Sequence, residues 1–307
     1  IQADRRGGQE DRRLMGPAMK EARFEDQQWD VVIRPDRPWW NIDLKEIWSY
    51  RDLLALLVRR DLTAVYKQTI LGPVWQVLQP LLTSIMFAVV FGVIFKRASM
   101  AGIPPLLFYM SAIVPWGFFS GVITRTSQTL VWNQALMTKV YFPRLVAPLA
   151  TVLSTGFSFL VQLSAFLLFA VVFAVLGKFQ WHLGQALLAV PVLVLLLTLF
   201  AFGLGIMVAA LTTRFRDLSL LIGFAVQLLM YMSPVIFPLS IAKEGSTLRL
   251  LLKANPVTPI IEGFRAAFFG LPMEWNTLWY SAAASLVALV VGLIMFQRVE
   301  RSFADVV

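Results

Sequence analysis

Residues 184–212 read GQALLAVPVLVLLLTLFAFGLGIMVAALT and include no charged side chain. A helix needs about 20 apolar residues to cross roughly 30 Å of bilayer hydrocarbon. This segment is longer than that minimum, so it predicts a membrane-spanning helix that tilts or extends past the bilayer. The chain is therefore expected to be an integral membrane protein.

Five further segments qualify by the same criterion, so the sequence predicts an all-α polytopic membrane protein with six transmembrane helices. Pro104, Pro105 and Pro115 interrupt the second span. A transmembrane domain over residues 71–307 is expected to hold all six. The other five spans cover residues 73–95, 103–124, 145–176, 218–241 and 277–296.

The composition supports the membrane assignment and excludes several functions. The 307 residues are 58% hydrophobic and 15% charged, against about 25% charged in a soluble domain. The net charge of +9 would suit a nucleic-acid binder, but the basic residues lie at the start of the chain and between apolar runs, as in membrane proteins. Cysteine is absent and His182 is the only histidine, so no metal site is expected. A GxxxxGK[ST] loop for ATP phosphates is also absent.

The orientation follows from Lys and Arg, which gather on the cytoplasmic side of a membrane. For six spans, 20 of these residues fall on one side and 7 on the other. The side with 20 includes the N-terminal region, the loop of residues 125–144 and the C-terminus. Both termini are therefore predicted to be cytoplasmic.

A basic amphipathic helix is predicted just before the first span. Apolar residues recur at helical spacing between Ile47 and Val65, and basic residues lie mainly on the other side. Such a helix usually lies along the inner membrane surface, and the alternative is packing on a soluble domain. We assign residues 44–70 to this interfacial helix and residues 1–43 to a cytoplasmic tail. Its marker residues are Arg59, Arg60, Tyr66 and Lys67.

The segment between the fifth and sixth spans is too polar to span and too apolar for a free loop. Residues 240–276 contain two short apolar stretches separated by Asn255-Pro256 and followed by Gly270-Leu-Pro272. This pattern predicts an outer re-entrant helical hairpin. Irregular backbone at that depth requires protein or a water-filled cavity around it. Two helices resting on the outer surface are the alternative.

The six predicted spans contain no Asp, Glu, Lys, Arg or His. Ionisable residues inside a membrane usually mark proton relays or ion coupling. Their absence indicates that energy for uphill transport comes from another subunit.

Aromatic residues are abundant in the same spans. Phe87, Phe91 and Phe95 recur every four residues in the first span, and Trp116 lies in the second. Such residues either face lipid and protein or line a substrate path, because aromatic faces stack weakly on sugar rings. We name these four residues as the candidate path.

Several motifs, in this order and placement, give the chain its family resemblance. They are Arg59-Arg-Asp-Leu with Tyr66-Lys-Gln-Thr-Ile-Leu-Gly-Pro-Val-Trp75, Lys139-Val-Tyr-Phe-Pro-Arg144, Arg214-Phe-Arg-Asp217, Ser233-Pro-Val-Ile236, Asn255-Pro-Val-Thr-Pro-Ile and Gly263-Phe-Arg265. With them the chain resembles the type-2 ABC exporter permeases of O-antigen, teichoic acid and capsule polysaccharides over most of residues 44–299.

The resemblance implies a homodimer in the inner membrane with two cytoplasmic ATPase subunits, which bind ATP and Mg. No cofactor is expected in this chain. The implied cargo is a polysaccharide on undecaprenyl diphosphate. The loop of residues 132–144 would couple to the ATPase, or serve only as an interfacial anchor. The coupling residues would be Lys139, Tyr141, Phe142, Pro143 and Arg144.

The hairpin would then gate the outer mouth of the path. Arg265 either meets the lipid-linked diphosphate or pairs with Glu262. The candidate gate residues are Glu262, Phe264, Arg265 and Phe268. Three other functions stay open, namely a type-2 exporter of a small lipid or drug, a membrane glycosyltransferase acting on a lipid carrier, and an ATP-independent flippase, which would normally need more spans.

Overall fold

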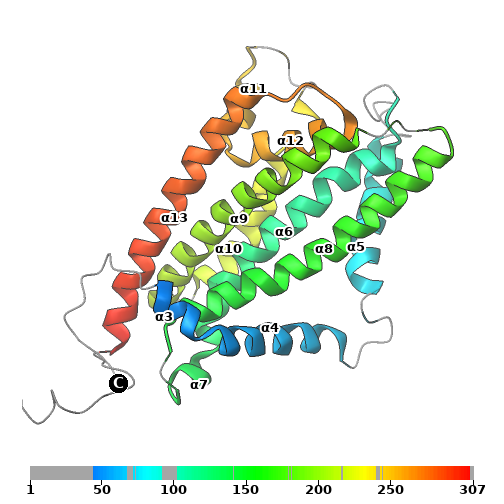
Figure 1. Cartoon of the computed structure of the whole chain (residues 1–307). Coiled ribbons are helices and arrows are strands. Elements are labelled where there is room, and N and C mark those ends of the chain that lie inside the picture. The colour runs from blue at the N-terminus through cyan, green and yellow to red at the C-terminus, as the bar shows by residue number, and fades with distance from the viewer. Residues whose placement is uncertain are drawn as a thin grey trace, which may run out of the picture. The chain divides into compact units, whose positions relative to one another are not determined.

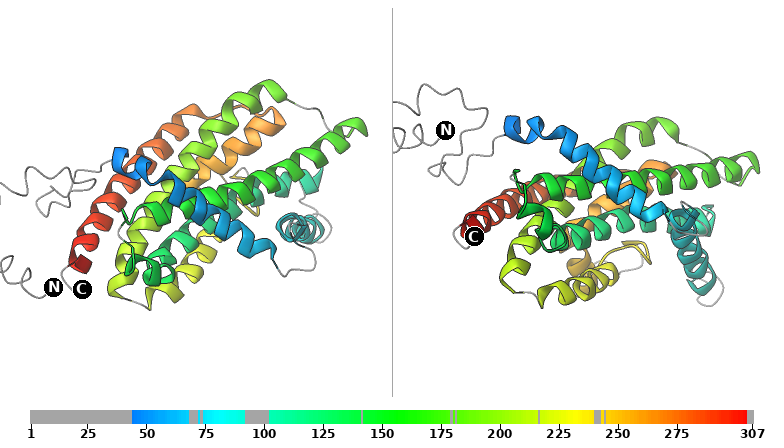
Figure 2. Two further views of the ribbon diagram at one scale, coloured as in Figure 1. Left: turned by 60° about the horizontal axis from the view of Figure 1, so that its bottom comes forward. Right: turned by 90° about the horizontal axis from the view of Figure 1, so that it is seen from below.

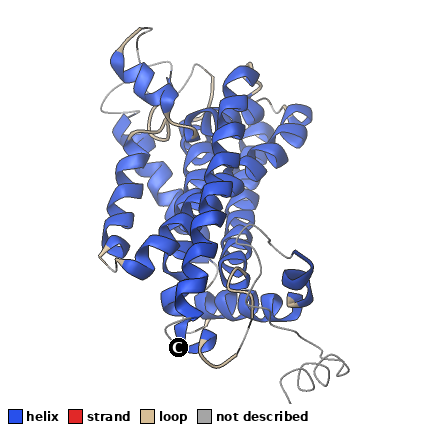
Figure 3. Cartoon of the chain, turned by 90° about the vertical axis from the view of Figure 1, so that its left-hand side faces the viewer, coloured by secondary structure: helices blue, strands red, loops and turns tan. Residues whose placement is uncertain are grey.

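The computed structural model describes residues 44–67, 72, 74–91, 102–140, 142–178, 180, 182–215, 217–239, 243 and 245–304, which lie in one compact unit. Throughout these residues the regular structure is helical, with no strand (Figure 3). The helices are α3 (Leu44–Ser49), α4 (Arg51–Tyr66), α5 (Val74–Val89), α6 (Pro105–Trp132), α7 (Gln134–Met137), α8 (Val146–Val175), α9 (Leu183–Arg214), α10 (Leu218–Tyr231), α11 (Thr247–Ala254), α12 (Val257–Phe269) and α13 (Trp275–Ala304).

Within the described part of the chain, α6, α8, α9 and α13 are long and apolar enough to cross a membrane. Helices α5 and α10 are apolar but shorter, with 16 and 14 residues. These six helices correspond to the six predicted spans. Four of the six therefore have the length of a span, and the number six stays a prediction.

Several helix ends differ from the predicted boundaries; α5 ends at Val89 instead of residue 95, and α13 continues to Ala304 instead of ending at residue 296. Helix α10 ends at Tyr231 instead of residue 241, because Pro234 lacks an N–H and disfavours helix in the residue before it. Helix α6 continues to Trp132, although the second span was predicted to end at Thr124. The polar residues that follow Thr124 lower the hydropathy but do not break a helix.

Helix α6 lies at the centre and α9 packs along both α6 and α13 (Figure 1). Helix α12 is enclosed by α6, α9 and α13, and Glu262 is its only residue that is not buried. Helix α11, by contrast, is largely exposed. The re-entrant hairpin and its depth in a bilayer therefore stay a prediction.

Helix α4 crosses the start of α8, as Figure 2 shows from below. Leu57 of α4 is 2% exposed and belongs to one apolar cluster with Phe142, Val146 and Ala147. The predicted interfacial helix therefore packs on protein along one side. Its basic residues Arg59 and Arg60 are exposed, as an interfacial helix requires.

Candidate functional site

The candidate outer gate is built around a fully buried arginine on α12. Arg265 is 0% exposed. Its Nη1 donates to Oε1 of Glu262 at 3.0 Å, and its Nη2 donates to the carbonyl oxygen of Val235 at 2.9 Å. The same Glu262 oxygen accepts a bond from the backbone N–H of Leu239 at 3.1 Å. Arg265 thus joins α12 to the segment that follows α10, and of the two alternatives the structure holds the pairing with Glu262.

The Arg265 guanidinium also lies over an aromatic ring. Its central carbon is 4.3 Å from the centroid of Phe108 in α6, a geometry that stabilises a cation. Burial lowers the pKa of Arg265, and the charge of Glu262 opposes that change. An arginine begins so far above neutral that it stays charged. The Nε atom is buried and has no hydrogen-bond partner among the described residues.

The Asn255-Pro256 turn fixes the start of α12. Asn255 Nδ2 donates to Ser233 Oγ at 2.8 Å and to the Met232 carbonyl at 3.0 Å, while its Oδ1 accepts from Val257 N–H at 3.0 Å. One amide side chain therefore joins the start of α12 to the residues that follow α10. Two motifs quoted from the sequence, Ser233-Pro and Asn255-Pro, meet here in space.

The two aromatic gate residues are part of the core. Phe264 and Phe268 are 0% and 5% exposed, and the Phe268 ring lies 4.7 Å from that of Phe166 in α8. Beside Glu262 is a cavity of about 240 Å³, which Lys253 and Glu274 also line. Helix α12 is therefore well packed except at this cavity, and the role of the hairpin as a gate stays a prediction.

The candidate path residues on α5 contact α6. The rings of Phe87 and Phe91 lie 5.9 and 6.4 Å from that of Tyr109, and Tyr109 lies 5.3 Å from Phe108. Because Phe108 lies under Arg265, one series of ring contacts joins the candidate path to the candidate gate. Phe108 and Tyr109 were not singled out from the sequence, because two adjacent residues do not form a stripe along one helix face.

The remaining path residues differ in position. Trp116 is 6% exposed and its ring lies 5.3 Å from Phe119, which stacks on Phe200 at 5.8 Å. In this state Trp116 is therefore packed in the core. Phe95 lies outside the described residues.

The candidate coupling residues divide into exposed and buried ones. Lys139 is exposed after the short helix α7, whereas Phe142 is 5% exposed and packs against α4 and α8. Pro143 and Arg144 are partly buried, and Tyr141 lies outside the described residues. The sequence grouped these residues by adjacency, and of the four that the structure describes only Lys139 is exposed.

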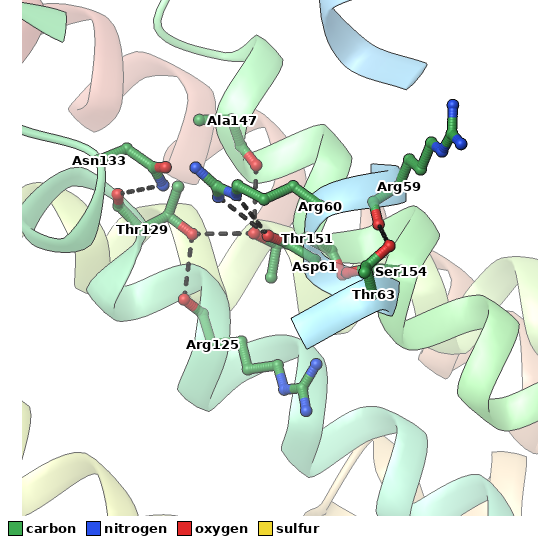
Figure 4. A network of polar contacts seen from close by, with 10 residues as sticks. All are labelled: Arg59, Arg60, Asp61, Thr63, Arg125, Thr129, Asn133, Ala147, Thr151 and Ser154. Atoms are coloured by element: carbon green, nitrogen blue, oxygen red, sulfur yellow. Dashed lines mark hydrogen bonds and ion pairs between the residues drawn. The ribbon is translucent and has the colours of Figure 1, made fainter. Parts of the chain in front are cut away.

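The basic residues of α4 are close to a polar network on α6 and α8. Arg60 Nη2 lies 2.9 Å from Asp61 Oδ1, and Thr129 and Thr151 share a hydrogen bond of 3.0 Å (Figure 4). Helix α4 ends at Tyr66, and Lys67 after it is exposed.

Figure 4 also shows Arg125, which was predicted to lie in a loop and which lies inside α6.

Long apolar helices, an amphipathic helix across their ends and a buried helical hairpin define a polytopic membrane protein. The sequence profile of the ABC-2 type transporter family matches residues 52–269. The chain therefore belongs to the ABC-2 type transporter family, which confirms the resemblance and makes it a transport subunit and not an enzyme.

Curated relatives cover nearly the same length. The chain is 29% identical to the O-antigen export system permease protein RfbA of Myxococcus xanthus, over 85% of this chain and 98% of that protein. It is 27% identical to the protein of the same name from Klebsiella pneumoniae, over 83% and 95%. It is also 25% identical to the polysialic acid transport protein KpsM of Escherichia coli, over 80% and 93%.

Proposed function

We propose that this chain is the membrane-spanning subunit of an ATP-driven exporter that moves undecaprenyl-diphosphate-linked polysaccharide across the inner membrane. The family match over residues 52–269 carries the proposal, together with relatives that are named for export of O-antigen and polysialic acid. The working unit is a homodimer with two cytoplasmic ATPase subunits, which bind ATP and Mg. Both termini face the cytoplasm.

The residues of the described helices agree with energy supplied from outside the membrane. No Asp or Glu occurs in α5, α6, α8, α9 or α10, so these helices lack the carboxylate that proton-coupled transport normally uses. ATP hydrolysis in the partner would change the conformation of the path. The exposed part of the loop around Lys139 would transmit this change. Aromatic contacts would let a glycan slide, because they require no single sugar register.

Transport by the purified complex tests this function. The chain and its ATPase subunit are placed in sealed vesicles with a fluorescent undecaprenyl-diphosphate-linked glycan, and transferred glycan is measured by its protection from added glycosidase. We expect protection only with ATP and Mg, and no ATP hydrolysis by the chain alone. Transport of a fluorescent short lipid or drug, with no transfer of glycan, would overturn the cargo assignment.

A further inference from the structure

One stretch of the central helix is open to its surroundings. Between Leu107 and Thr129 of α6, only six residues are not buried. They recur at intervals of three and four, so they share one face of the helix. This α6 open face consists of Gly117, Ser120, Gly121, Thr124, Arg125 and Gln128.

The composition of the α6 open face differs from that of the apolar surfaces of α8, α9 and α13. It holds only glycine, hydroxyl, amide and guanidinium groups. Lipid chains require apolar side chains, and polar groups within a membrane face protein or a water-filled cavity. By contrast, the exposed surfaces of α8, α9 and α13 carry Leu153, Leu160, Leu168, Leu187, Leu188, Leu195, Leu286, Val287 and Val290.

The neighbours of the α6 open face are polar as well. A Cβ built on Gly117 would lie 3.6 Å from Gln162 Oε1, and one on Gly121 would lie 3.1 Å from Thr155 Cγ2. Gln76 of α5 donates to Ser158 of α8 at 3.1 Å. The polar lining therefore continues from α6 onto α8 and is not one isolated stripe.

Arg125 is the only cation on this face. No hydrogen bond or ion pair joins its guanidinium to the described residues, and Figure 4 shows it directed away from the Thr129–Thr151 pair. It lies seven residues before Trp132, the last residue of α6, which is about 10 Å at 1.5 Å per residue. No carboxylate lies on α5, α6, α8, α9 or α10, so these helices provide no counterion and leave the exposed guanidinium of Arg125 available to an anionic ligand.

We propose that Arg125 binds the diphosphate of the lipid-linked glycan when the cargo enters the α6 open face from the cytoplasmic side. This inference rests on the proposed function. A guanidinium presents a planar set of donors that matches phosphate oxygens in pairs. The glycines and the small hydroxyl side chains beside it leave room for a head group and its first sugars. They provide no apolar surface for the acyl chains of an ordinary phospholipid.

The test is direct binding to the purified complex of this chain with its ATPase subunit. Native mass spectrometry measures the dissociation constant for undecaprenyl diphosphate, with phosphatidylglycerol as the second probe. The variants are Arg125→Gln and Arg125→Lys. Lys178→Gln, which removes one exposed charge beyond the other end of α8, is the matched control.

We expect Arg125→Gln to weaken undecaprenyl diphosphate binding about tenfold or more. Arg125→Lys should lose less, because it keeps the charge but not the paired donors. Binding of phosphatidylglycerol and the melting temperature should match those of Lys178→Gln. Equal losses for both lipids would show an ordinary lipid-phosphate contact and overturn the cargo assignment.

The outcomes also separate this inference from the proposed function. A wild-type complex that binds undecaprenyl diphosphate with the same constant as Arg125→Gln overturns the role of Arg125 alone. A wild-type complex that neither binds this lipid nor transports its glycan overturns the proposed function, and the cargo at Arg125 with it.

Discussion

The backbone of Gly203 in α9 lies directly against that of Gly292 in α13. A Cβ built on Gly203 would stand 2.5 Å from the carbonyl carbon of Ala288, and one on Gly292 would meet the Gly203 carbonyl oxygen. Real Cβ atoms do not approach backbone this closely. Small residues let membrane helices come together and gain van der Waals contact, so this crossing requires glycine on both helices.

Replacing Gly292 should therefore separate α9 from α13. We expect Gly292→Ala to destabilise the protein by about 1–3 kcal/mol, the usual cost of added volume in a packed core. The matched control is Gly223→Ala on α10, where a Cβ would meet nothing within 4 Å. Melting temperatures in detergent compare the two variants, and equal values would contradict this packing.

The Arg265–Glu262 pair should respond unequally to loss of either partner. Arg265 is 0% exposed, whereas 24% of the Glu262 side chain is exposed. Glu262→Ala leaves a buried charge without its counterion, for which the cost is about 3–5 kcal/mol. Arg265→Met removes that charge, keeps most of the volume and leaves Glu262 its bond to Leu239 N–H. We expect Glu262→Ala to melt at a lower temperature, and the reverse order would argue against this electrostatic account.

The loop before α8 should separate into a structural part and a coupling part. Phe142→Ala removes a buried ring between α4 and α8, at a cost of about 3–5 kcal/mol, and should lower the melting temperature. Lys139→Ala changes an exposed side chain and should leave melting unchanged while it weakens association with the ATPase subunit. Co-purification yields measure that association. Normal ATPase recovery with Lys139→Ala would remove this residue from the coupling surface.

The α5 aromatic residues distinguish a path from simple packing. Phe87→Ala with Phe91→Ala removes both ring contacts to Tyr109, and Leu82→Ala, on an exposed part of the same helix, is the control. If the rings line the path, glycan export per molecule of folded protein falls or changes with chain length. If they only pack, the amount of folded protein falls and export per molecule stays constant.

The absence of native cysteine makes the topology easy to measure. Single cysteines replace Val140 and Gln180 in separate variants, and a membrane-impermeant maleimide is added to intact cells. We expect labelling at 180 and none at 140, because the Lys and Arg distribution places residue 140 inside. Labelling at 140 would reverse the orientation.

Hydropathy predicted the positions of the apolar helices well but not where they end. The second span was predicted to end at Thr124 because Arg125, Ser127 and Gln128 lower the local hydropathy. None of these residues prevents a helix, and α6 continues to Trp132. A polar face inside a buried helix is invisible to an average over a window, so the α6 open face emerged only from burial in three dimensions.

At the candidate gate, too, one contact could be predicted from the sequence and another could not. The spacing of Glu262 and Arg265 is three residues, which allows contact on one helix face, and their pairing was one of the two alternatives read from the sequence. The third partner, the Val235 carbonyl, is 30 residues away in the chain. A sequence does not show which distant residue a backbone carbonyl will contact. This hydrogen bond and the burial of Phe142 could therefore be found only from the structure.

The α6 open face ends at Gly117, and every residue from Leu107 to Trp116 is buried. Water that follows the polar face would therefore stop at a buried segment made mostly of aromatic and aliphatic side chains. We expect that segment to prevent protons and inorganic ions from conducting along α6 in this state. An exporter at rest would then preserve the membrane potential.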